Sequence, residues 1–521
     1  MRFVLRLVSC CSACFELDND APYYAPRPYR VFIDGNAAGE ERAENVFSLF
    51  GLAPDTEYAV CVQPGGETLT FRTGKESARL FVRAFGAVGD GIADDTRAVQ
   101  SAIDACPPGG RVTVGPGVYR VAPLALKSCL TLELMKNAVL LGSANEGDYP
   151  VLPALAGEDQ DGNPLVMSAW EGRPHASHQS LLGAFHARDM FIVGEGALDG
   201  NARDAGWWVE PKKRKAGRPR MLFLNGCENV AVHGVHVTNA PAWNLHPFRS
   251  RGIGFYDIDV TAPKDSPNTD GCDPESCEDV TILGARFSVG DDAIAIKSGK
   301  AADGELFFPP ARRHTIRNCH MRFAHGAVVL GSEMSGGIGE IEVKQCLFAD
   351  TDRGLRIKTR RGRGKYGVID GVTFENIRMT GVKTPLVINM FYFCDPDGHS
   401  GYVQSRDALP VDERTPYLGA FTFRNLVCED CRVAAGCFYG LPEQPVGSVT
   451  IEDAAFSFAA DAAPDVPAMM DDMQPCAKRG LIFSNVDGVC LNRVSFSGIE
   501  GERVSLAGVK RFWEDKTQWT R

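Results

Sequence analysis

The sequence predicts an all-β chain in which a right-handed parallel β-helix, a solenoid with an N-terminal capping helix, follows a small β-sandwich. Three observations lead to this fold class. A short apolar motif repeats nine times from about residue 228 onward, glycine accounts for 55 of the 521 residues, and the first 78 residues alternate apolar and polar positions between turn residues. We therefore expect two domains, the sandwich over residues 1–78 and the β-helix over residues 79–521.

The apolar repeat predicts the coils of the β-helix. Its unit is apolar-x-apolar-x-x-apolar-x-apolar, as in residues 230–237 and 449–456. Two apolar residues at a period of two, a break of two residues and two more apolar residues describe a short strand, a corner and a second strand. Because one coil cannot bury its own inner face, neighbouring coils must stack. The many glycines suit corners at which the backbone takes a positive φ.

A helix is expected before the first coils. Apolar residues at helical spacing follow Asp94-Asp95-Thr96, whose side chains can cap a helix start. These apolar residues are Ala98, Val99, Ala102 and Ile103. Such a helix would close the open end of the cylinder, which otherwise exposes apolar side chains and strand edges.

The first 78 residues differ in kind from the coils. Segments 29–35, 51–58 and 69–73 combine alternating strand patterns with turn residues. The turn over residues 52–58, with Leu, Pro, Thr and Tyr at every second position, resembles the turn before a strand of fibronectin type III domains. This resemblance implies a β-sandwich that shapes one end of a groove or acts as a spacer.

Composition and charge exclude several classes of function. The net charge of −11 and a pI near 5.5 argue against nucleic acid or an acidic membrane surface as the partner. No apolar run is long enough for a transmembrane helix. Arg6 interrupts the apolar N-terminal stretch, and Glu16 and Asp18 follow it. We therefore expect a strand rather than a signal peptide, and a cytoplasmic protein, with secretion or the periplasm as the alternative.

The cysteines also favour a cytoplasmic protein. The 17 cysteines are scattered along predicted strands, and many stand beside apolar residues. This pattern indicates buried thiols in a reducing compartment rather than a disulfide framework. The CxxC pairs at 11–14 and 428–431 have no further ligands at zinc-site spacing, so we interpret them as packing residues.

Two acidic motifs fall on consecutive coils, NTDG at residues 268–271 and GDDA at 290–293. Since the corners of stacked coils match, residues about 20 apart in sequence can lie about 4.8 Å apart on one exposed face. Asp270, Asp291 and Asp292 would then converge, and repulsion between the adjacent Asp291 and Asp292 should raise the pKa of one of them. A carboxylic acid beside an ionised carboxylate is what glycoside hydrolysis needs. The alternative for the Asp-Asp pair is a solvated turn.

Basic residues gather on the coils that follow. His325 lies on the next coil, and Arg356 and Lys358 lie on the one after that. Arg356 and Lys358 are two apart on a strand and so share a face, which must be solvent because a charged pair would not enter the apolar bore. Arginine and lysine together suit a sugar carboxylate. Residues 353–365 contain seven basic residues and no acidic one, which is the local patch that an anionic ligand needs on an acidic protein.

These motifs, in this order on a β-helical repeat, resemble those of glycoside hydrolase family 28, the polygalacturonase family of pectin-degrading enzymes. The resemblance extends over about residues 80–510. One departure is Ala324-His325-Gly326, where the family usually has Gly-His-Gly, and an alanine is tolerated there unless its φ is positive. The resemblance implies an inverting hydrolase of α-1,4-galacturonide bonds, acting on a galacturonate-containing polysaccharide or oligosaccharide without a metal or other cofactor.

The resemblance also implies catalytic roles. Asp291 would be the general acid that protonates the leaving oxygen, whereas Asp270 and Asp292 would be the bases that hold the attacking water. His325 would orient or tune the acid, with a purely structural role as its alternative.

Substrate contacts are implied for four further positions. Arg356 and Lys358 would hold the carboxylate of the sugar on the leaving-group side. We also expect Asn268, from the NTDG motif, and Tyr392 to bind substrate. Tyr392 would stack on a sugar or donate its hydroxyl, and packing within the coil is its alternative.

Two long insertions interrupt the coils, at residues 143–188 and 390–418. Long loops at one end of a groove would close it into a pocket that accepts only chain ends. Together with the N-terminal domain, they resemble the bacterial exo-acting branch of the family. Two other classes stay open: a pectate lyase-like β-helix, which cleaves by β-elimination with Ca²⁺ and an arginine base, and a non-catalytic β-helix that binds polysaccharide.

Overall fold

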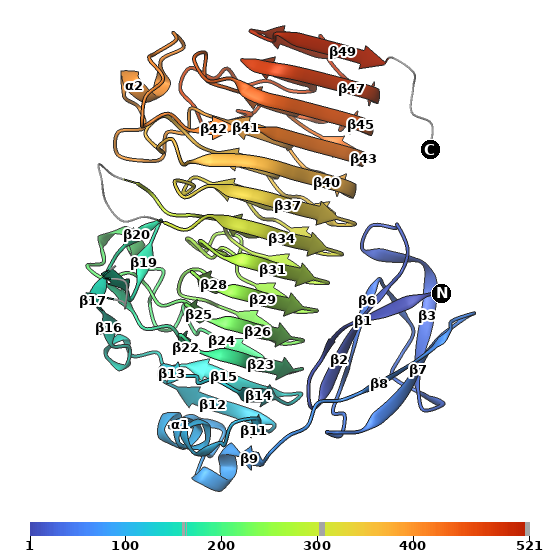
Figure 1. Ribbon diagram of the computed structural model, residues 1–521, viewed down its shortest axis with the longest axis vertical. Coiled ribbons are helices and arrows are strands. Elements are labelled where there is room, and N and C mark those ends of the chain that lie inside the picture. Colours follow the sequence, from blue (N-terminus) through green and yellow to red (C-terminus); the bar gives the residue numbers. More distant parts are fainter. Residues whose placement is uncertain (159–161, 163, 302–307, 516–521) are drawn as a thin grey trace.

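The chain forms a long solenoid with a small domain packed against one side (Figure 1). Parallel strands stack from the cyan end, near α1 (Thr96–Ala105), to the red end at β49 (Arg511–Asp515). Most of them belong to one sheet of 24 strands. The predicted parallel β-helix is therefore confirmed. The computed structural model describes residues 1–158, 162, 164–301 and 308–515.

The coils contribute strands to three faces. The first face contains β11 (Gly110–Val114), β14 (Leu130–Leu134), β23 (Arg188–Gly194), β26 (Glu228–His233), β29 (Arg251–Tyr256), β31 (Glu278–Leu283), β34 (Ala311–Arg317), β37 (Ile338–Lys344), β40 (Val368–Thr380), β43 (Ala420–Cys431), β45 (Val446–Phe458), β47 (Val486–Ser497) and β49. The second face contains β10 (Asp90–Asp94), β12 (Gly117–Val121), β15 (Ala138–Gly142), β24 (Ala197–Asp199), β27 (His236–Thr238), β30 (Asp259–Thr261), β32 (Arg286–Ser288), β35 (His320–Arg322) and β38 (Leu347–Ala349), which pairs with the second half of β40.

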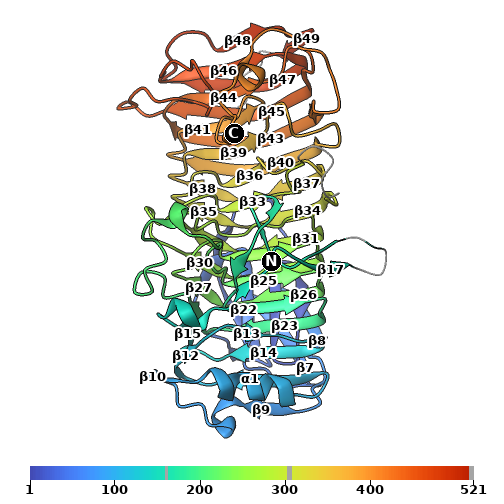
Figure 2. The ribbon, with the colours of Figure 1, turned by 90° about the vertical axis from the view of Figure 1, so that its left-hand side faces the viewer.

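The third face is turned toward the viewer in Figure 2. It contains β13 (Leu124–Ala125), β22 (Leu182–Phe185), β25 (Leu222–Asn225), β28 (Leu245–Phe248), β33 (Ile294–Ile296), β36 (Val328–Gly331), β39 (Arg353–Lys358), β41 (Thr384–Asn389), β44 (Ala434–Tyr439), β46 (Arg479–Ser484) and β48 (Val504–Ala507). Single bridges through Cys272 join β28 to β33, so the face is continuous through the middle of the molecule.

Apolar side chains of the repeat fill the bore in register. Val230 pairs with Ile253, and Ile253 pairs with Val280 in the next coil. The next position of this ladder is His314, which is buried and whose Nε2 lies 3.0 Å from the carbonyl oxygen of Cys277. Burial lowers the pKa of His314 to about 4, so a neutral imidazole takes an apolar position. Because a histidine stands at this apolar position, the sequence repeat is weak in the coil that contains β34.

Helix α1 closes the N-terminal end of the bore, next to β9 (Arg79–Phe81) and η1 (Val82–Phe85) (Figure 1). Its buried residues are Val99, Ala102 and Ile103. The expected helix is confirmed, but its N-terminus differs in detail. Oδ1 of Asp94 accepts the N–H of Thr96 at 3.0 Å, whereas Asp95 turns away from the helix and accepts the N–H of Val88 at 2.6 Å. Asp95 therefore anchors the preceding loop instead of capping the helix.

The N-terminal domain consists of two small antiparallel groups of strands around a core of its own. They are β1 (Phe3–Val8), β2 (Ser12–Leu17) and β6 (Val46–Phe50) in one, and β3 (Tyr24–Ile33), β4 (Asn36–Ala37), β5 (Arg42–Glu44), β7 (Glu57–Gln63) and β8 (Thr68–Arg72) in the other. The boundary at residue 78 and the fibronectin type III likeness stay predictions.

Polar contacts attach this domain to the corner between the first and second faces. His233 is buried, with Nδ1 3.0 Å from Oγ of Ser12 and Nε2 2.8 Å from Oγ of Ser48. Burial lowers the pKa of His233 to about 3, so the ring is neutral. The side-chain amide of Asn45 donates to Oδ1 of Asn318 at 2.9 Å. The domain thus lies on the side of the solenoid away from the third face (Figure 1).

The two insertions lie along the third face, on the left in Figure 1. The first contains η2 (Glu146–Asp148), β16 (Val151–Leu152), β17 (Leu155–Glu158), β18 (Pro164–Val166), β19 (Ala169–Trp170), β20 (Arg173–Pro174) and β21 (Ser177–His178), which pair as β16–β21, β17–β18 and β19–β20. The second contains α2 (Gly401–Gln404) and β42 (Tyr417–Leu418). The turn before β25 contains η3 (Pro211–Lys213). Among the described helices, none has the length and apolar character that crossing a membrane requires.

Candidate active site

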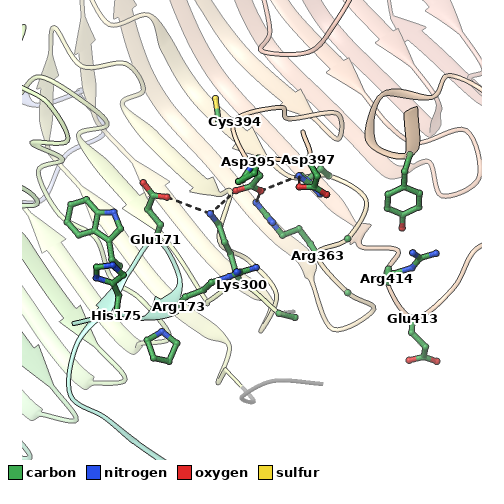
Figure 3. A pocket seen from close by; sticks show the side chains of 18 residues that line it. Glu171, Arg173, His175, Lys300, Arg363, Cys394, Asp395, Asp397, Glu413 and Arg414 are labelled. Atoms are coloured by element: carbon green, nitrogen blue, oxygen red, sulfur yellow. Dashed lines mark hydrogen bonds and ion pairs between the residues drawn. The ribbon is translucent and has the colours of Figure 1, made fainter. Parts of the chain in front are cut away.

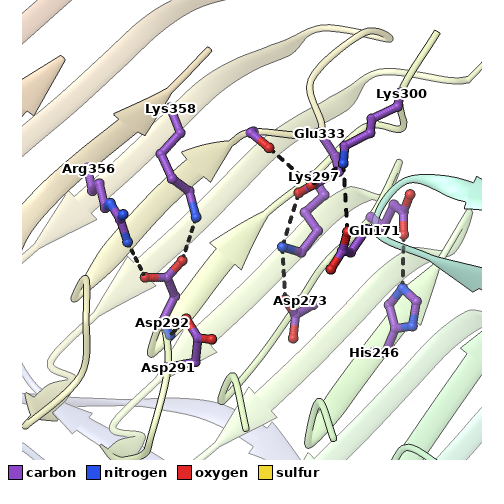
Figure 4. A network of polar contacts seen from close by, with 12 residues as sticks. Glu171, His246, Asp273, Asp291, Asp292, Lys297, Lys300, Glu333, Arg356 and Lys358 are labelled. Carbon is purple, nitrogen blue, oxygen red and sulfur yellow. Dashed lines mark hydrogen bonds and ion pairs between the residues drawn. The ribbon is translucent and has the colours of Figure 1, made fainter. Parts of the chain in front are cut away.

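Three carboxylates converge where the strands of the third face begin, and Figure 4 shows two of them, Asp291 and Asp292. Asp270 precedes the bridge at Cys272, and Asp292 precedes β33 in the next coil. The N–H of Gly271 donates to the main-chain carbonyl of Asp292 at 3.0 Å, so the stacking of the coils places Asp270 beside Asp292. One ligand oxygen of each of Asp270, Asp291 and Asp292 lies within 4.8 Å of the others. The coil spacing thus brings together the three carboxylates that the two motifs supply.

Asp292 is buried and paired with two cations. Nη1 of Arg356 donates to its Oδ1 at 3.2 Å, and Nζ of Lys358 donates to its Oδ2 at 2.8 Å. Burial alone would raise the pKa of Asp292, but the positive charges of Lys358 and Arg356 outweigh it and hold the pKa below its ordinary value. Asp292 is therefore ionised at neutral pH. The two cations predicted to hold a sugar carboxylate also neutralise a carboxylate of the protein.

Asp270 has the opposite electrostatic environment. It is buried, and its Oδ1 forms no hydrogen bond with the residues that the structure describes. Burial, together with repulsion from Asp273 and Asp291, raises the pKa of Asp270 well above its ordinary value. Repulsion between Asp291 and Asp292 was expected to raise the pKa of one of the two, and at Asp292 the pKa is lowered instead. A carboxyl with a raised pKa is thus supplied by the neighbouring coil, at Asp270.

The glycine of the NTDG motif is required by space. A Cβ atom on Gly271 would lie 2.4 Å from the carbonyl oxygen of Ala293 and 2.4 Å from the ring of Phe287. Because real Cβ atoms do not approach so closely, only glycine lets these two coils stack at this point. The short distance between Asp270 and Asp292 depends on this glycine.

His325 lies beside Asp291 at the open side of the cluster. Its Nδ1 is 3.3 Å from Oδ1 of Asp291, and its main-chain N–H donates to the carbonyl of Asp291 at 3.0 Å. The hydrogen bond to Asp291 raises the pKa of His325 above 6.5. The side chain of His325 is half exposed, whereas that of Asp291 is 25% exposed. The φ of Ala324 is not positive, which explains why an alanine can replace the family's glycine at this position.

The carboxylates border a cavity of about 130 Å³ on the third face. Asn268 and Tyr392 both line it, together with Trp243. Oδ1 of Asn268 accepts a hydrogen bond from Nη2 of Arg218 at 2.6 Å, so Arg218 holds the amide in place. The ring of Tyr392 lies 5.7 Å from Nζ of Lys358. The structure therefore places both predicted substrate-binding residues at the cavity wall.

The run of basic residues at 353–365 does not form one patch. Arg356 and Lys358 face the carboxylates, but Arg361 is buried and its Nε donates to Glu443 at 2.6 Å. Nη2 of Arg363 donates to Asp395 at 2.6 Å. The expected local patch is thus reduced to two cations at the carboxylates, because other members of the run are held in structural ion pairs.

Sequence reasoning missed a buried ion cluster of Lys297, Asp273 and Glu333 (Figure 4), of which Lys297 and Glu333 line the cavity. Nζ of Lys297 lies 3.4 Å from Oδ1 of Asp273 and 3.3 Å from Oε2 of Glu333, and 4.8 Å from the ring centre of Trp243. Burial raises the pKa of Asp273 to about 8. All three charged residues are less than a tenth exposed. The sequence did contain one signal for Lys297. This lysine comes directly after β33, at the position that stacks in register with Lys358 two coils later, so it would lie on the same face as Lys358.

Three comparisons with known proteins agree with this geometry. The model of the family Glycosyl hydrolases family 28 matches residues 169–404, which span the carboxylates and both cations. A probable polygalacturonase from Vitis vinifera is 30% identical over 389 residues, covering 73% of this chain and 74% of that protein. An exo-poly-alpha-D-galacturonosidase from Dickeya chrysanthemi is 25% identical over 438 residues, covering 73% of this chain and 68% of that protein.

Solved structures share the fold. The family 28 exopolygalacturonase of Yersinia enterocolitica superposes with a TM-score of 0.72 at 20% identity, and the match covers 99% of each chain. An exopolygalacturonase from Thermotoga maritima has a TM-score of 0.61 at 24% identity, covering 81% of this chain and 92% of that one. The relative at 30% identity, the family match across the carboxylates and the shared β-helix lead to one conclusion: the chain belongs to glycosyl hydrolase family 28 and is a glycoside hydrolase.

Proposed function

We propose that the protein hydrolyses the α-1,4-galacturonide bonds of polygalacturonate or of oligogalacturonides, starting from a chain end. The observation that carries this proposal is the carboxylate cluster on the wall of the cavity, where Asp292 pairs with Lys358, which lines the same cavity, and with Arg356 beside it. Two cations beside acid–base groups suit a sugar that bears a carboxylate next to the bond to be cleaved. The printed names of the relatives, polygalacturonase and exo-poly-alpha-D-galacturonosidase, support the same substrate class.

In the proposed reaction Asp291 is the general acid. Its partly exposed side chain can reach a glycosidic oxygen at the cavity, and His325 on its open side holds it in orientation. Water attacks the anomeric carbon while the proton of Asp291 moves to the leaving oxygen. Asp292 accepts the proton of the water, and Asp270, whose pKa is raised by burial, positions that water by hydrogen bonding.

Substrate binding would strengthen Asp292 as a base. In the free protein Arg356 and Lys358 both donate to Asp292, which weakens its affinity for a proton. A sugar carboxylate that shares these two cations would draw part of their charge away from Asp292. Its pKa would then rise when the correct substrate is present. A neutral sugar in the same place would leave Asp292 a poor base.

Attack from a chain end is supported by the insertions. Glu171 of the first insertion and Asp395 of the second both line the catalytic cavity, together with Tyr392. Pockets that bind drug-sized ligands usually measure about 300–1,000 Å³. A cavity of about 130 Å³ therefore suits a single terminal sugar rather than the middle of a chain.

The test is product analysis with purified protein on polygalacturonate, digalacturonate and rhamnogalacturonan. We expect new reducing ends and monogalacturonate from the first two substrates, whereas a ladder of oligomers would contradict exo action. Products with an ultraviolet-absorbing double bond, formed only without chelator, would indicate a lyase instead. Binding without any new reducing ends would indicate the non-catalytic alternative.

Proton NMR of the first-formed product tests the stereochemistry. The three carboxylates lie within 4.8 Å of one another, closer than the roughly 6.5–9.5 Å of the usual inverting pair. We nevertheless propose inversion, because the water would be held by Asp270 and Asp292 while a third carboxyl supplies the proton. The first product should then have the β configuration, and an α product would contradict it.

A further inference from the structure

A second, larger pocket adjoins the catalytic cavity on the third face (Figure 3). Its volume is about 980 Å³, against about 130 Å³ for the catalytic cavity. Glu171, Lys300, Cys394 and Asp395 line both spaces. These four residues are therefore the partition between them.

Lys300 lies at the centre of this partition. Its Nζ donates to Oδ1 of Asp395 at 2.9 Å and lies 3.4 Å from Oε1 of Glu333 and 3.9 Å from Oε2 of Glu171. The side chain of Lys300 is 9% exposed, whereas that of Glu171 is 54% exposed. Glu171 belongs to the first insertion, Asp395 to the second and Glu333 to a coil. One ammonium group thus connects three separate parts of the chain.

The main chain supports the same connection. The N–H of Lys300 donates to the carbonyl of Gly172 at 2.8 Å. Gly172 has a φ of 78°, and a Cβ atom there would lie 2.7 Å from Cγ of Glu333 and 2.8 Å from the nitrogen of Lys300. The turn between β19 and β20 therefore presses directly against Lys300, with no space for another side chain.

Asp395 is fixed from the side of the larger pocket as well. Its Oδ2 accepts a hydrogen bond from Nη2 of Arg363 at 2.6 Å and lies 3.4 Å from Nη1 of Arg360. Removing Lys300 would leave Asp395 its two arginines. Within the described part of the chain, it would leave Glu171 without an ion-pair partner. Loss of Lys300 should therefore free the first insertion more than the second.

The larger pocket has a lining that can accept an acidic sugar. Its basic side chains number five and its acidic ones four, a net charge of +1. The basic residues are Arg173, Lys300, Arg360, Arg363 and Arg414, and the acidic ones are Glu171, Asp395, Asp397 and Glu413. What separates this space from the catalytic cavity is the partition and not an unfavourable charge.

We propose that Lys300 is the specificity-determining residue that ends the substrate-binding cavity and so sets the length of the sugar released. This inference rests on the proposed function. With Lys300 in place, the terminal galacturonate meets the partition and one sugar is released per cleavage. Without it, the two spaces join, and a second galacturonate at the chain end can extend into the larger pocket.

The test compares product lengths from polygalacturonate for the wild type, Lys300→Ala and Lys300→Arg. We expect wild type to release monogalacturonate, and Lys300→Ala to release digalacturonate as a major product, at least ten times its share in wild type. Lys300→Arg keeps the cation and should restore the wild-type pattern. Lys510→Ala is the matched control, because Lys510 forms a comparable ion pair with Asp487 at 2.8 Å outside both pockets.

Each outcome decides a separate question. Monogalacturonate alone from a folded Lys300→Ala variant would overturn the role of Lys300, whatever the rate. If thermal unfolding shows that this variant does not fold, Lys300→Ser opens the same space and leaves a hydroxyl near Asp395 and Glu333, and monogalacturonate alone from Lys300→Ser would equally overturn the inference. A wild type that releases no reducing ends from any substrate would refute the proposed function itself. A change in kcat or stability without a change in product length would indicate a merely structural lysine.

Discussion

Nζ of Lys358 lies 2.8 Å from Oδ2 of Asp292, although their coils are separated by another coil of the solenoid. Gly331 of β36 pairs with Lys358 and has no side chain, and the coil between Lys358 and Asp292 leaves room for their contact. Gly326 is one reason, since a Cβ atom there would lie 3.2 Å from Oδ1 of Asp292. A cation proposed to bind substrate is thus linked to a carboxylate proposed to act as the base before any substrate arrives.

Replacing Asp291 by asparagine should lower kcat strongly and leave the fold intact. Asparagine has nearly the same shape but no proton to give, and general acid–base catalysis supplies about 10²–10⁴-fold in rate. We expect at least about 100-fold lower turnover of polygalacturonate, with an unchanged circular dichroism spectrum. A rate within a few fold of wild type would remove Asp291 from the role of acid.

Asp270→Asn should separate stability from activity. Because the folded-state pKa of Asp270 is raised, the folded state binds more protons than the unfolded state as the pH rises above the ordinary carboxyl pKa. Wild type therefore loses stability with rising pH in that range, and the asparagine variant does not. We expect Asp270→Asn to melt at a higher temperature than wild type at neutral pH, and the difference in melting temperature to disappear near pH 4. The variant should also hydrolyse polygalacturonate more slowly. A lower melting temperature for the variant at neutral pH would show that the buried carboxyl of Asp270 does not destabilise the folded protein at that pH.

Lys358→Met should mainly weaken substrate binding. A hydrogen bond to a charged group contributes about 1.5–3 kcal/mol, which corresponds to about 10- to 150-fold in affinity. We expect KM for oligogalacturonides to rise within that range. Lys365→Met is the control from the same basic run, since Lys365 is half exposed and pairs with Glu413 at 2.6 Å. If Lys358→Met and Lys365→Met raised KM equally, the weaker binding would reflect the loss of any positive charge rather than of a specific contact.

The titration of His325 should depend on Asp291. The hydrogen bond to Asp291 raises the pKa of His325, so their interaction stabilises the fold below the ordinary histidine pKa and is lost as the pH rises through the raised value. NMR of the imidazole protons should give a pKa above 6.5 in wild type and a value closer to 6.5 in Asp291→Asn. An unchanged pKa in the variant would mean that the two side chains do not interact in solution.

The fold and the converging carboxylates could be predicted because both follow from local repetition. The apolar ladder of residues 230–237 recurs in each coil, and the NTDG and GDD motifs stand one coil apart. The environment of each carboxyl could not be predicted. The direction in which the pKa of Asp270 or of Asp292 shifts depends on side chains from coils up to 66 residues away, 358 − 292 in sequence, and on burial that no local pattern reports.

The cluster of Lys297, Asp273 and Glu333 was missed for a related reason. A lysine directly after a short apolar strand looks like a solvent-exposed strand end, because lysine is almost never fully buried unless it is paired. Its partners lie 24 and 36 residues away in sequence, as 297 − 273 and 333 − 297 give. Long sequence separation also hid the ion pairs of Arg361 with Glu443 and of Arg363 with Asp395. These structural ion pairs therefore looked like part of a binding patch.

The hydrogen bond from Gly271 to Asp292 has a consequence for how such enzymes can vary. The separation of Asp270 from Asp292 is fixed by the main chains of two stacked coils, not by the length of the segment that connects them. Turns that carry none of these groups can grow or shrink while Asp270 and Asp292 keep their places. Loop length and catalytic geometry are therefore independent, and substrate choice can evolve by insertion without rebuilding the acid and the base.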